Sequence, residues 1–172
     1  MVTQGNEQPR VLRPALESMT LLVAAVIVHD TAADRVLLLQ RGEQAKFARG
    51  KWDLPVGKSE PGEAVTGTAV RELWEETGLT VRPEALRIAH VVHSARGVEA
   101  PGGFLTVVFA ADRWSGEPEN REPHKHSQVC WVDTDAIPGE FVPSSAGALH
   151  SYLSQHQAQA QARVEITLHG WG

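Results

Sequence analysis

The sequence predicts an α/β domain in which a mixed β-sheet packs between helices. Two strand-like apolar runs come first, an amphipathic helix follows them, and further strands with a late helix complete the chain. A chain of 172 residues has the length of one domain and can bury a sizeable core. No internal repeat is visible. We therefore expect an N-terminal arm at residues 1–17 and a single domain at residues 18–172.

The first strands are predicted to form a β-hairpin. Residues 21–29 and 35–40 are apolar and rich in β-branched residues or leucine, and residues 30–34 between them carry turn signals. Residues 42–58 are expected to form a loop.

The apolar spacing after this loop predicts a helix. Gly67 is a poor residue for a helix interior, so the helix is expected to start near Thr66, and Gly78 is expected to cap its end. The side chains expected on its apolar stripe are Val65, Ala69, Val70, Leu73 and Trp74.

The second half of the chain is predicted to add strands and one helix. The expected strands are residues 86–94, 104–113 and 128–133, with a polar loop at 115–126. Ser144 or Ser145 can cap a helix that carries Leu149, Tyr152 and Leu153. After a Gln- and Ala-rich tail, Val164, Ile166 and Leu168 alternate with polar residues, which is typical of an edge strand.

The first helix carries acids where a helix built for stability would not. Glu72 and Glu76 are neighbours four residues apart, Glu75 lies beside both, and all three crowd the C-terminal end, where the helix dipole favours cations. Glu76 is expected to be half-buried and to need a partner. Arg71 can pair with Glu63 or with Glu76. Such rule-breaking indicates a site, although a solvated charged face is the alternative interpretation.

Clustered carboxylates suit a hard divalent cation such as Mg²⁺ or Mn²⁺. The pattern around them is more specific than the acids alone. Gly57 is followed after five residues by Glu63 and, after seven more, by residues 71–79, with the sequence RELWEETGL. This pattern resembles the Nudix box at every defined position. A chance match has a probability on the order of 10⁻⁷ or less at average residue usage. Val56 stands where many members of that family carry glycine.

The resemblance implies an α/β/α sandwich over roughly residues 20–152 and roles for the residues of the box. Glu72, Glu75 and Glu76 are expected to bind the metal, with the carbonyl of Gly57 as a further ligand. Arg71 and Glu63 are expected to hold the helix and the loop in place. Members differ in which acid activates the water, so Glu72 and Glu75 are the first candidates and Glu122 is a weaker one.

Residues 120–125, with the sequence NREPHK, resemble the Asn-x-Glu-Pro-x-Lys segment of MutT-like nucleoside triphosphate pyrophosphohydrolases. His126 stands where that segment has cysteine. The expected contacts to the substrate come from Glu122 and Lys125 of this segment and from Arg41 and Lys58 of the basic stretch before the box. A plain surface loop would explain the same residues of the segment.

The expected function is therefore metal-dependent cleavage of the pyrophosphate linkage of a nucleoside diphosphate derivative, with a (d)NTP as the first substrate candidate and oxidised (d)NTPs among the candidates. An ADP-ribose or nucleotide-sugar pyrophosphatase is the alternative, although the proline that often follows the box in ADP-ribose hydrolases is absent between Pro83 and Pro101. A non-catalytic ligand-binding module on the same fold is a third interpretation, which the intact carboxylate set disfavours.

Composition limits the partners. The chain has 16 basic and 21 acidic residues, a net charge of −5, so it has no global basic field for a nucleic-acid polymer. The single cysteine, Cys130, excludes an intramolecular disulfide and is expected to be buried on a strand. Because no apolar run has the length of a membrane span and the N-terminus lacks a signal-like apolar region, we expect a cytoplasmic protein without a membrane partner. A homodimer is the one protein assembly that we consider.

The histidines receive no assigned role. His124 and His126 lie two apart in a loop without a third close zinc ligand, and His29, His90 and His93 lie on predicted strands.

Overall fold

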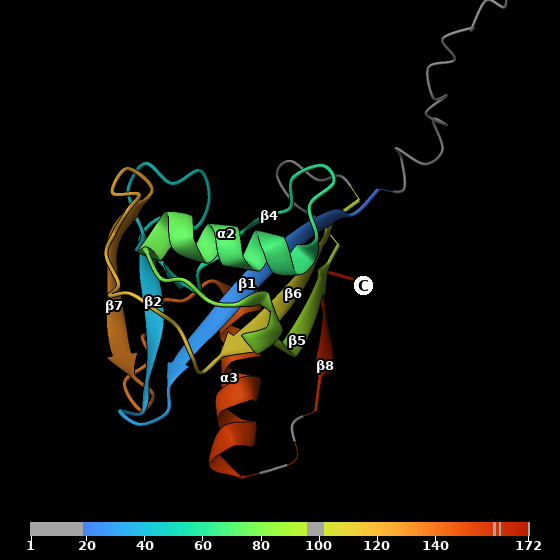
Figure 1. Ribbon diagram of the computed structural model, residues 1–172. Helices are drawn as coiled ribbons and strands as arrows, with labels where there is room; N and C mark the ends of the chain where they lie inside the picture. Colours follow the sequence, from blue (N-terminus) through green and yellow to red (C-terminus); the bar gives the residue numbers. More distant parts are fainter. Residues whose placement is uncertain (1–18, 96–101, 160, 162, 172) are drawn as a thin grey trace, which may run out of the picture.

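A mixed sheet lies between two helices in the computed structural model, which describes residues 19–95, 102–159, 161 and 163–171 (Figure 1). The expected arm at residues 1–17 lies outside the described residues. The strands are β1 (Leu21–Asp30), β2 (Arg35–Arg41), β3 (Trp52–Asp53), β4 (Val56–Lys58), β5 (Arg87–Ser94), β6 (Phe104–Ala111), β7 (His126–Asp133) and β8 (Glu165–His169). The helices are α2 (Val65–Thr77) and α3 (Pro143–Gln157), with a 3-10 turn, η1 (Pro83–Ala85). The predicted α/β class is confirmed.

The eight strands form one sheet whose main order is β3-β2-β1-β6-β5-β8, while β4 pairs with β1 and β7 pairs with β2. The pairs β1–β6 and β5–β8 are parallel, and the other pairs are antiparallel. The predicted edge strand near Ile166 is therefore present as β8. No helix of the described ranges has both the length and the apolar character needed to cross a bilayer.

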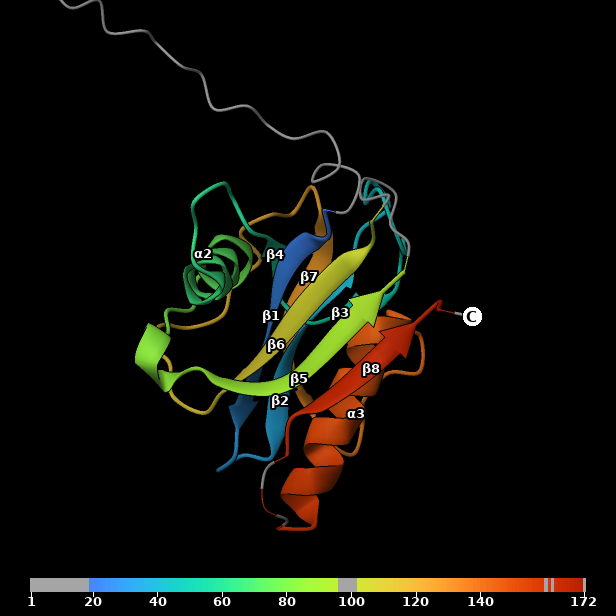
Figure 2. The same cartoon turned by 90° about the vertical axis from the view of Figure 1, so that its right-hand side faces the viewer.

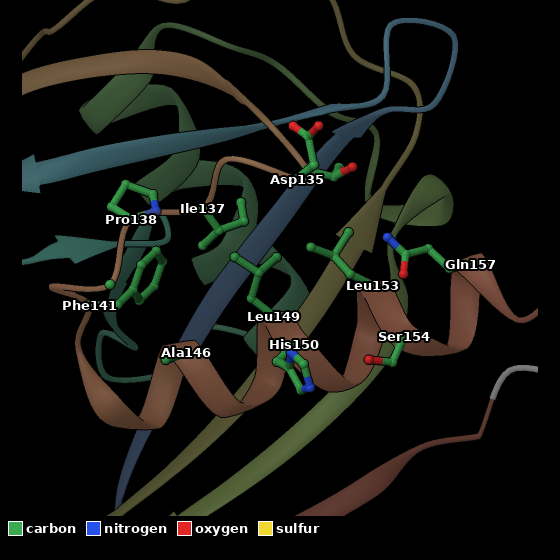
Figure 3. A pocket seen from close by; sticks show the side chains of 12 residues that line it. Asp135, Ile137, Pro138, Phe141, Ala146, Leu149, His150, Leu153, Ser154 and Gln157 are labelled. Atoms are coloured by element: carbon green, nitrogen blue, oxygen red, sulfur yellow. The ribbon is translucent and has the colours of Figure 1, made fainter.

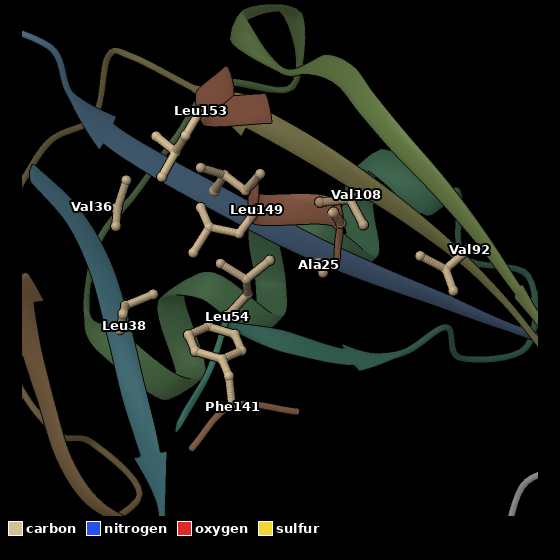
Figure 4. Packing of buried hydrophobic residues seen from close by; sticks show 11 residues of the cluster. Ala25, Val36, Leu38, Leu54, Val92, Val108, Phe141, Leu149 and Leu153 are labelled. Carbon is tan, nitrogen blue, oxygen red and sulfur yellow. The ribbon is translucent and has the colours of Figure 1, made fainter. Parts of the chain in front are cut away.

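The core has two halves because successive side chains of β1 point to opposite faces of the sheet. Ala25 and Ile27 join the cluster that faces α3, whereas Ala24, Val26 and Val28 join the cluster that faces α2. Figure 4 shows the α3 side, where Leu149 points toward Leu54 and Leu153 lies near Val36. Since both faces of β1 are covered, its near-continuous apolar sequence is explained.

The expected loop at residues 42–58 was partly wrong, because it contains β3 and β4. Both are very short and owe their pairing to β2 and β1. The hairpin of β1 and β2 is confirmed by the pairs His29–Val36 and Asp30–Arg35.

The helix starts differ from the predictions by one residue for α2 and by two or three residues for α3. Helix α2 begins at Val65 after an N-cap at Ala64, one residue before the expected start near Thr66, and it ends at Gly78 as predicted, with the left-handed φ of 74° that glycine adopts easily. Helix α3 begins at Pro143 after Val142, so neither Ser144 nor Ser145 caps it. Proline serves at this first position because its missing N–H would be unpaired there anyway.

Trp74 is also not on the buried stripe. Its side chain is 46% exposed, and the guanidinium of Arg121 lies 4.0 Å from the centre of its ring. The stripe itself faces the sheet through the buried Ala69 and Leu73. Cys130 is half-buried on β7, and burial raises the pKa of its thiol.

Candidate active site

The C-terminal half of α2 presents three carboxylates at increasing depth. The Glu75 side chain is 41% exposed, the Glu72 side chain is 15% exposed, and Glu76 is buried at 5%. We call these three residues the helix wall. Glu76 was expected to be half-buried, and the structure places it deeper, because β4 and the start of β7 both close over it.

Burial governs the charge of the helix wall. The backbone N–H of Val56 donates to Glu76 Oε2 at 2.9 Å. Even so, burial raises the pKa of Glu76 well above its usual value, and the nearby carboxylates of Glu72, Asp53 and Glu122 raise it further. Burial also raises the pKa of Glu72, against the lowering effect of Arg71. A cation that binds beside these carboxylates therefore stabilises their charged forms.

Arg71 connects Glu63 to two acids of the helix wall through its guanidinium group. Its Nε and a terminal nitrogen reach the two carboxylate oxygens of Glu63 at 2.8 and 2.9 Å, a bidentate pair. The other terminal nitrogen donates to Glu72 Oε1 at 2.7 Å and to Glu75 Oε2 at 3.2 Å. The backbone carbonyl of Lys58 accepts a further bond at 3.0 Å. Of the two partners considered from the sequence, Arg71 therefore takes Glu63 and not Glu76.

The Arg71–Glu63 pair makes stability depend on pH. Hydrogen bonds from Arg71, from the Glu60 backbone and from Thr68 lower the pKa of Glu63 to about 2. A carboxylate with a lowered native pKa stabilises the fold above its unfolded pKa, and this contribution disappears as the pH falls through the native value. At pH 6 the Glu63→Gln variant is thus expected to have a lower free energy of unfolding than the wild type. Between about pH 5 and pH 2 its free energy of unfolding should fall less than that of the wild type.

Urea unfolding at a series of pH values measures this difference. The matched control is Glu60→Gln, three residues away, which keeps the backbone N–H that bonds to Glu63. Parallel pH profiles of wild type and Glu63→Gln would contradict the prediction.

Gly57 lies on β4, opposite Ala24 of β1, directly beneath the helix wall. An added Cβ at this position would stand 1.8 Å from the carboxyl carbon of Glu72. Glycine is therefore required so that the backbone of β4 and the carboxylate of Glu72 can approach each other closely.

Residues 119–126 form the opposite side of the site and are fastened to α2 through the main chain. The N–H groups of Glu119 and Arg121 donate to the carbonyls of Thr77 and Glu76 at 2.9 and 3.3 Å. These carbonyls belong to the last turn of the helix, where they have no partner inside it. The segment then turns, as the N–H groups of Lys125 and His126 donate to the Glu122 carbonyl.

We call Glu122, Lys125 and His126 the loop wall. Lys125 Nζ lies 2.7 Å from Glu122 Oε1, and Glu122 Oε2 is buried with no hydrogen-bond partner among the described residues. Burial alone would lower the pKa of Lys125, but the bond with Glu122 and the charges of Glu76 and Glu72 raise it. The structure thus brings Glu122 and Lys125 to the helix wall.

His126 is a residue of this site to which the sequence analysis gave no role. It is the first residue of β7, it is buried, and its Nε2 lies 3.6 Å from Glu76 Oε1. Burial lowers the pKa of His126 to about 4, so its ring is neutral at neutral pH. The available signal was its place in the sequence, where the similar MutT-like segment has cysteine, a residue type that is often buried.

Asp53 is a second residue that the sequence analysis did not assign. It is buried on β3, where it pairs with Arg41 at 3.1 Å, and burial raises the pKa of its carboxyl group. Arg41 also donates to the carbonyl of Phe47 at 2.7 Å, so its guanidinium has a fixed position. Lys58, the other basic residue predicted near the substrate, is exposed at the end of β4.

Two other buried histidines differ from His126. His29 Nδ1 lies 3.1 Å from the hydroxyl of Tyr152, and His90 Nε2 lies 2.8 Å from that of Thr167. Both rings are buried and contact residues of α3 or β8 instead of the two walls, which agrees with a structural role.

Two cavities lie on the α3 side of the sheet, away from the box. The larger, of about 440 Å³, lies between α3 and the segment before it, where Ile137, Phe141, Leu149 and His150 line it (Figure 3). The smaller, of about 250 Å³, is lined by residues such as Arg87, Tyr152 and His156. Neither is lined by a residue of the helix wall or the loop wall.

The donors of this site suit a hard divalent cation. They are carboxylate oxygens, together with the carbonyl of Gly57, and such oxygens are the ligands that Mg²⁺ and Mn²⁺ prefer. Glu122 Oε2 has no hydrogen-bond partner among the described residues, and burial raises the pKa values of Glu72 and Glu76, so a cation bound between these acids would stabilise them.

Comparison with known proteins places this geometry in a family. The family described as the NUDIX domain matches residues 19–152. The chain is 40% identical over 143 residues to human 8-oxo-dGDP phosphatase NUDT18, covering 81% of this chain but only 40% of the human protein. It is 32% identical over 129 residues to "Putative 8-oxo-dGTP diphosphatase 2" of Mycobacterium tuberculosis, covering 70% of this chain and 82% of that protein.

A solved structure supports the same assignment. The MutT NUDIX hydrolase from Burkholderia pseudomallei superimposes with a TM-score of 0.67 at 25% identity, over 77% of this chain and 98% of that protein. The chain therefore belongs to the Nudix hydrolase family.

Proposed function

We propose that this hydrolase cleaves a phosphoanhydride bond of a nucleoside triphosphate or diphosphate with Mg²⁺ or Mn²⁺, and that its substrate is a purine nucleotide with an oxidised base. Water is added across the bond: a triphosphate gives a monophosphate and pyrophosphate, and a diphosphate gives a monophosphate and phosphate. The proposal depends on one observation: the helix wall lies close to the loop wall and to the backbone of Gly57.

In this proposal, Glu72, Glu75 and Glu76 hold the metal, with the carbonyl of Gly57 as a further donor. The metal, when bound, neutralises the phosphate oxygens and lowers the pKa of water. Phosphoryl transfer requires mainly positioning and charge stabilisation from the protein. The proton of the attacking water passes to a carboxylate oxygen of Glu72 or Glu75.

The other residues position these groups or the phosphates. Arg71 and Glu63 fix the carboxylates of Glu72 and Glu75, because Arg71 contacts all three acids. Lys125 carries positive charge on the side facing the helix wall, where it can contact a phosphate oxygen. Arg41 and Lys58 supply positive charge at two further points of the site rim, beside β3 and β4.

The substrate class is supported by the relatives. The human protein is named an 8-oxo-dGDP phosphatase and the mycobacterial one a putative 8-oxo-dGTP diphosphatase. The two names differ in the number of phosphates, and they share an oxidised guanine nucleotide.

The deciding experiment is a substrate panel with purified protein and either Mg²⁺ or Mn²⁺. The panel contains 8-oxo-dGTP, 8-oxo-dGDP, the normal NTPs and dNTPs, ADP-ribose and nucleotide sugars, and released phosphate and pyrophosphate are measured separately. We expect the highest kcat/KM for an oxidised guanine nucleotide. A higher value for ADP-ribose or a nucleotide sugar would overturn the substrate class, and no turnover of any compound with metal bound would overturn the catalytic function.

A further inference from the structure

Three side chains from two segments converge beside the box. They are Glu76 of α2, Glu122 of the loop before β7 and His126 at the start of β7. One ligand atom of each lies within 4.8 Å of the others. Glu76 and His126 are both more than nine-tenths buried. The Oε2 of Glu122 is buried without a hydrogen-bond partner in the described part of the chain, and Nε2 is the ring nitrogen that His126 turns toward Glu76. Unpaired polar atoms in a buried site require an explanation.

A cation shared by the three side chains would give the unpaired Oε2 of Glu122 a partner. His126 Nε2 and Glu76 Oε1 are 3.6 Å apart, which is too far for a hydrogen bond. Two donors on one metal ion, each bonded at roughly 2.0–2.2 Å, stand about 3.0–3.5 Å apart, so only a small movement is needed.

We propose that His126 is a metal ligand together with Glu76 and Glu122, and that this nitrogen donor makes the site select Mn²⁺ over Mg²⁺. The inference rests on the proposed function, because it concerns the same carboxylate site. Imidazole suits transition metals, whereas Mg²⁺ prefers oxygen donors throughout. The chain thus differs at this position from a site built from oxygen donors alone.

Pulsed electron paramagnetic resonance of bound Mn²⁺ tests the proposal directly. A coordinated imidazole couples its ¹⁴N nucleus to the electron spin of Mn²⁺, and carboxylates do not. We expect ¹⁴N modulation in the wild-type protein and in His124→Gln, a matched control because His124 is exposed two residues before His126. We expect no modulation in His126→Gln. Absence of ¹⁴N modulation in the wild-type spectrum would overturn the proposal, whatever the folding of the variant.

Calorimetric titration supplies the second measurement. In His126→Gln the Kd for Mn²⁺ is expected to rise about tenfold or more, while the Kd for Mg²⁺ changes much less. Equal weakening of both ions would overturn the selectivity. Failure here is distinguishable from failure of the proposed function, because the latter predicts loss of turnover in variants of Glu72 or Glu75 whichever ion His126 favours.

A separate observation concerns the edge of the sheet. Four large apolar side chains are exposed within one short run: Val164 (54%), Ile166 (67%), Leu168 (64%) and Trp171 (52%). Two of them lie on β8, which is the end strand of the sheet beside β5, with α3 behind it (Figure 2). An edge strand carries a row of unpaired backbone groups that can pair with another strand.

The sequence of β8 is complementary to itself in the antiparallel direction. If two copies pair about Thr167, Glu165 of one protomer faces the partner's His169, and Ile166 faces the partner's Leu168. Each pair joins an acid to a basic ring or an apolar residue to an apolar residue, which are favourable cross-strand pairs. The symmetry is that of a two-fold dimer, the commonest assembly of identical chains.

We infer that a second copy of this chain pairs with β8 to form a homodimer. Light scattering coupled to size-exclusion chromatography tests this with the full chain over a wide concentration range. We expect a dimer for the wild type and for the control Phe47→Lys, whose side chain is 53% exposed elsewhere. We expect a folded monomer for Ile166→Lys/Leu168→Lys, because both side chains are exposed within one protomer. A wild type that is monomeric throughout, or a dimer that survives both lysines, would overturn the inference.

Discussion

The Gly57→Ala variant is expected to lose about a hundredfold or more of its turnover while it stays folded. The new methyl group would stand 1.8 Å from the carboxyl carbon of Glu72, so that carboxylate must move by more than an ångström. A displacement of about 1 Å at a reacting centre can cost a hundredfold in rate. Steady-state kinetics on the best substrate of the panel measure the effect, and circular dichroism verifies the fold.

The same motif offers a matched glycine control. Gly67 lies inside α2, and a Cβ there meets only Glu63 Cγ at 3.6 Å, an ordinary contact. Gly67→Ala is expected to stabilise the protein by roughly 0.5–1 kcal/mol, because alanine is the better helix former, and to keep wild-type turnover. Wild-type turnover in Gly57→Ala would instead show that Glu72 can occupy another position without loss.

The Glu75→Gln variant is expected to fold normally and to lose about a thousandfold in turnover. Glu75 is the most exposed acid of the helix wall, and a glutamine oxygen can still accept the bond from Arg71. The amide lacks the negative charge that the proposed metal site requires, and losing charge stabilisation of this kind costs about 10²–10³ or more.

Measurements of rate and of metal uptake separate the causes. Calorimetry should show weaker binding of Mn²⁺ and Mg²⁺ to Glu75→Gln, with an unfolding midpoint close to that of wild type. The control is Glu84→Gln, an exposed glutamate on η1 outside both walls, which should match the wild type in both measurements. Wild-type kcat in Glu75→Gln would exclude Glu75 from the catalytic site.

The long elements could be predicted from the sequence because their signals are local. β1 and β2 have runs of apolar residues, and α2 ends where Gly78 permits a left-handed turn. β3 and β4 could not be predicted, since two- and three-residue strands have no periodicity and exist only through pairing with distant strands. The start of α3 was missed because Pro143 provides the N-terminal signal where a serine was expected.

The site was predictable to the extent that spacing determines it. The spacing of the acids on α2 puts Glu72, Glu75 and Glu76 on one side of a helix, and the segment around Glu122 faces them as the sequence suggested. The depth of Glu76 was not predictable, because burial depends on β4 and on His126, which are distant in sequence. Asp53 and His126 were missed for the same reason. Asp53 ends the two-residue strand β3, and His126 begins β7, which was expected to start at residue 128. Pairing with the distant strand β2 determines where both side chains point.

The attachment of residues 119–126 to the last turn of α2 has an energetic consequence. Main-chain hydrogen bonds hold the acids of both segments at short range, so mutual repulsion cannot spread them apart. The cost of crowding these charges is therefore met when the polypeptide folds, by the cooperative energy of the whole domain. A bound cation then reduces the repulsion between these carboxylates without first ordering a loop. Cation binding therefore raises the free energy of unfolding of the whole domain.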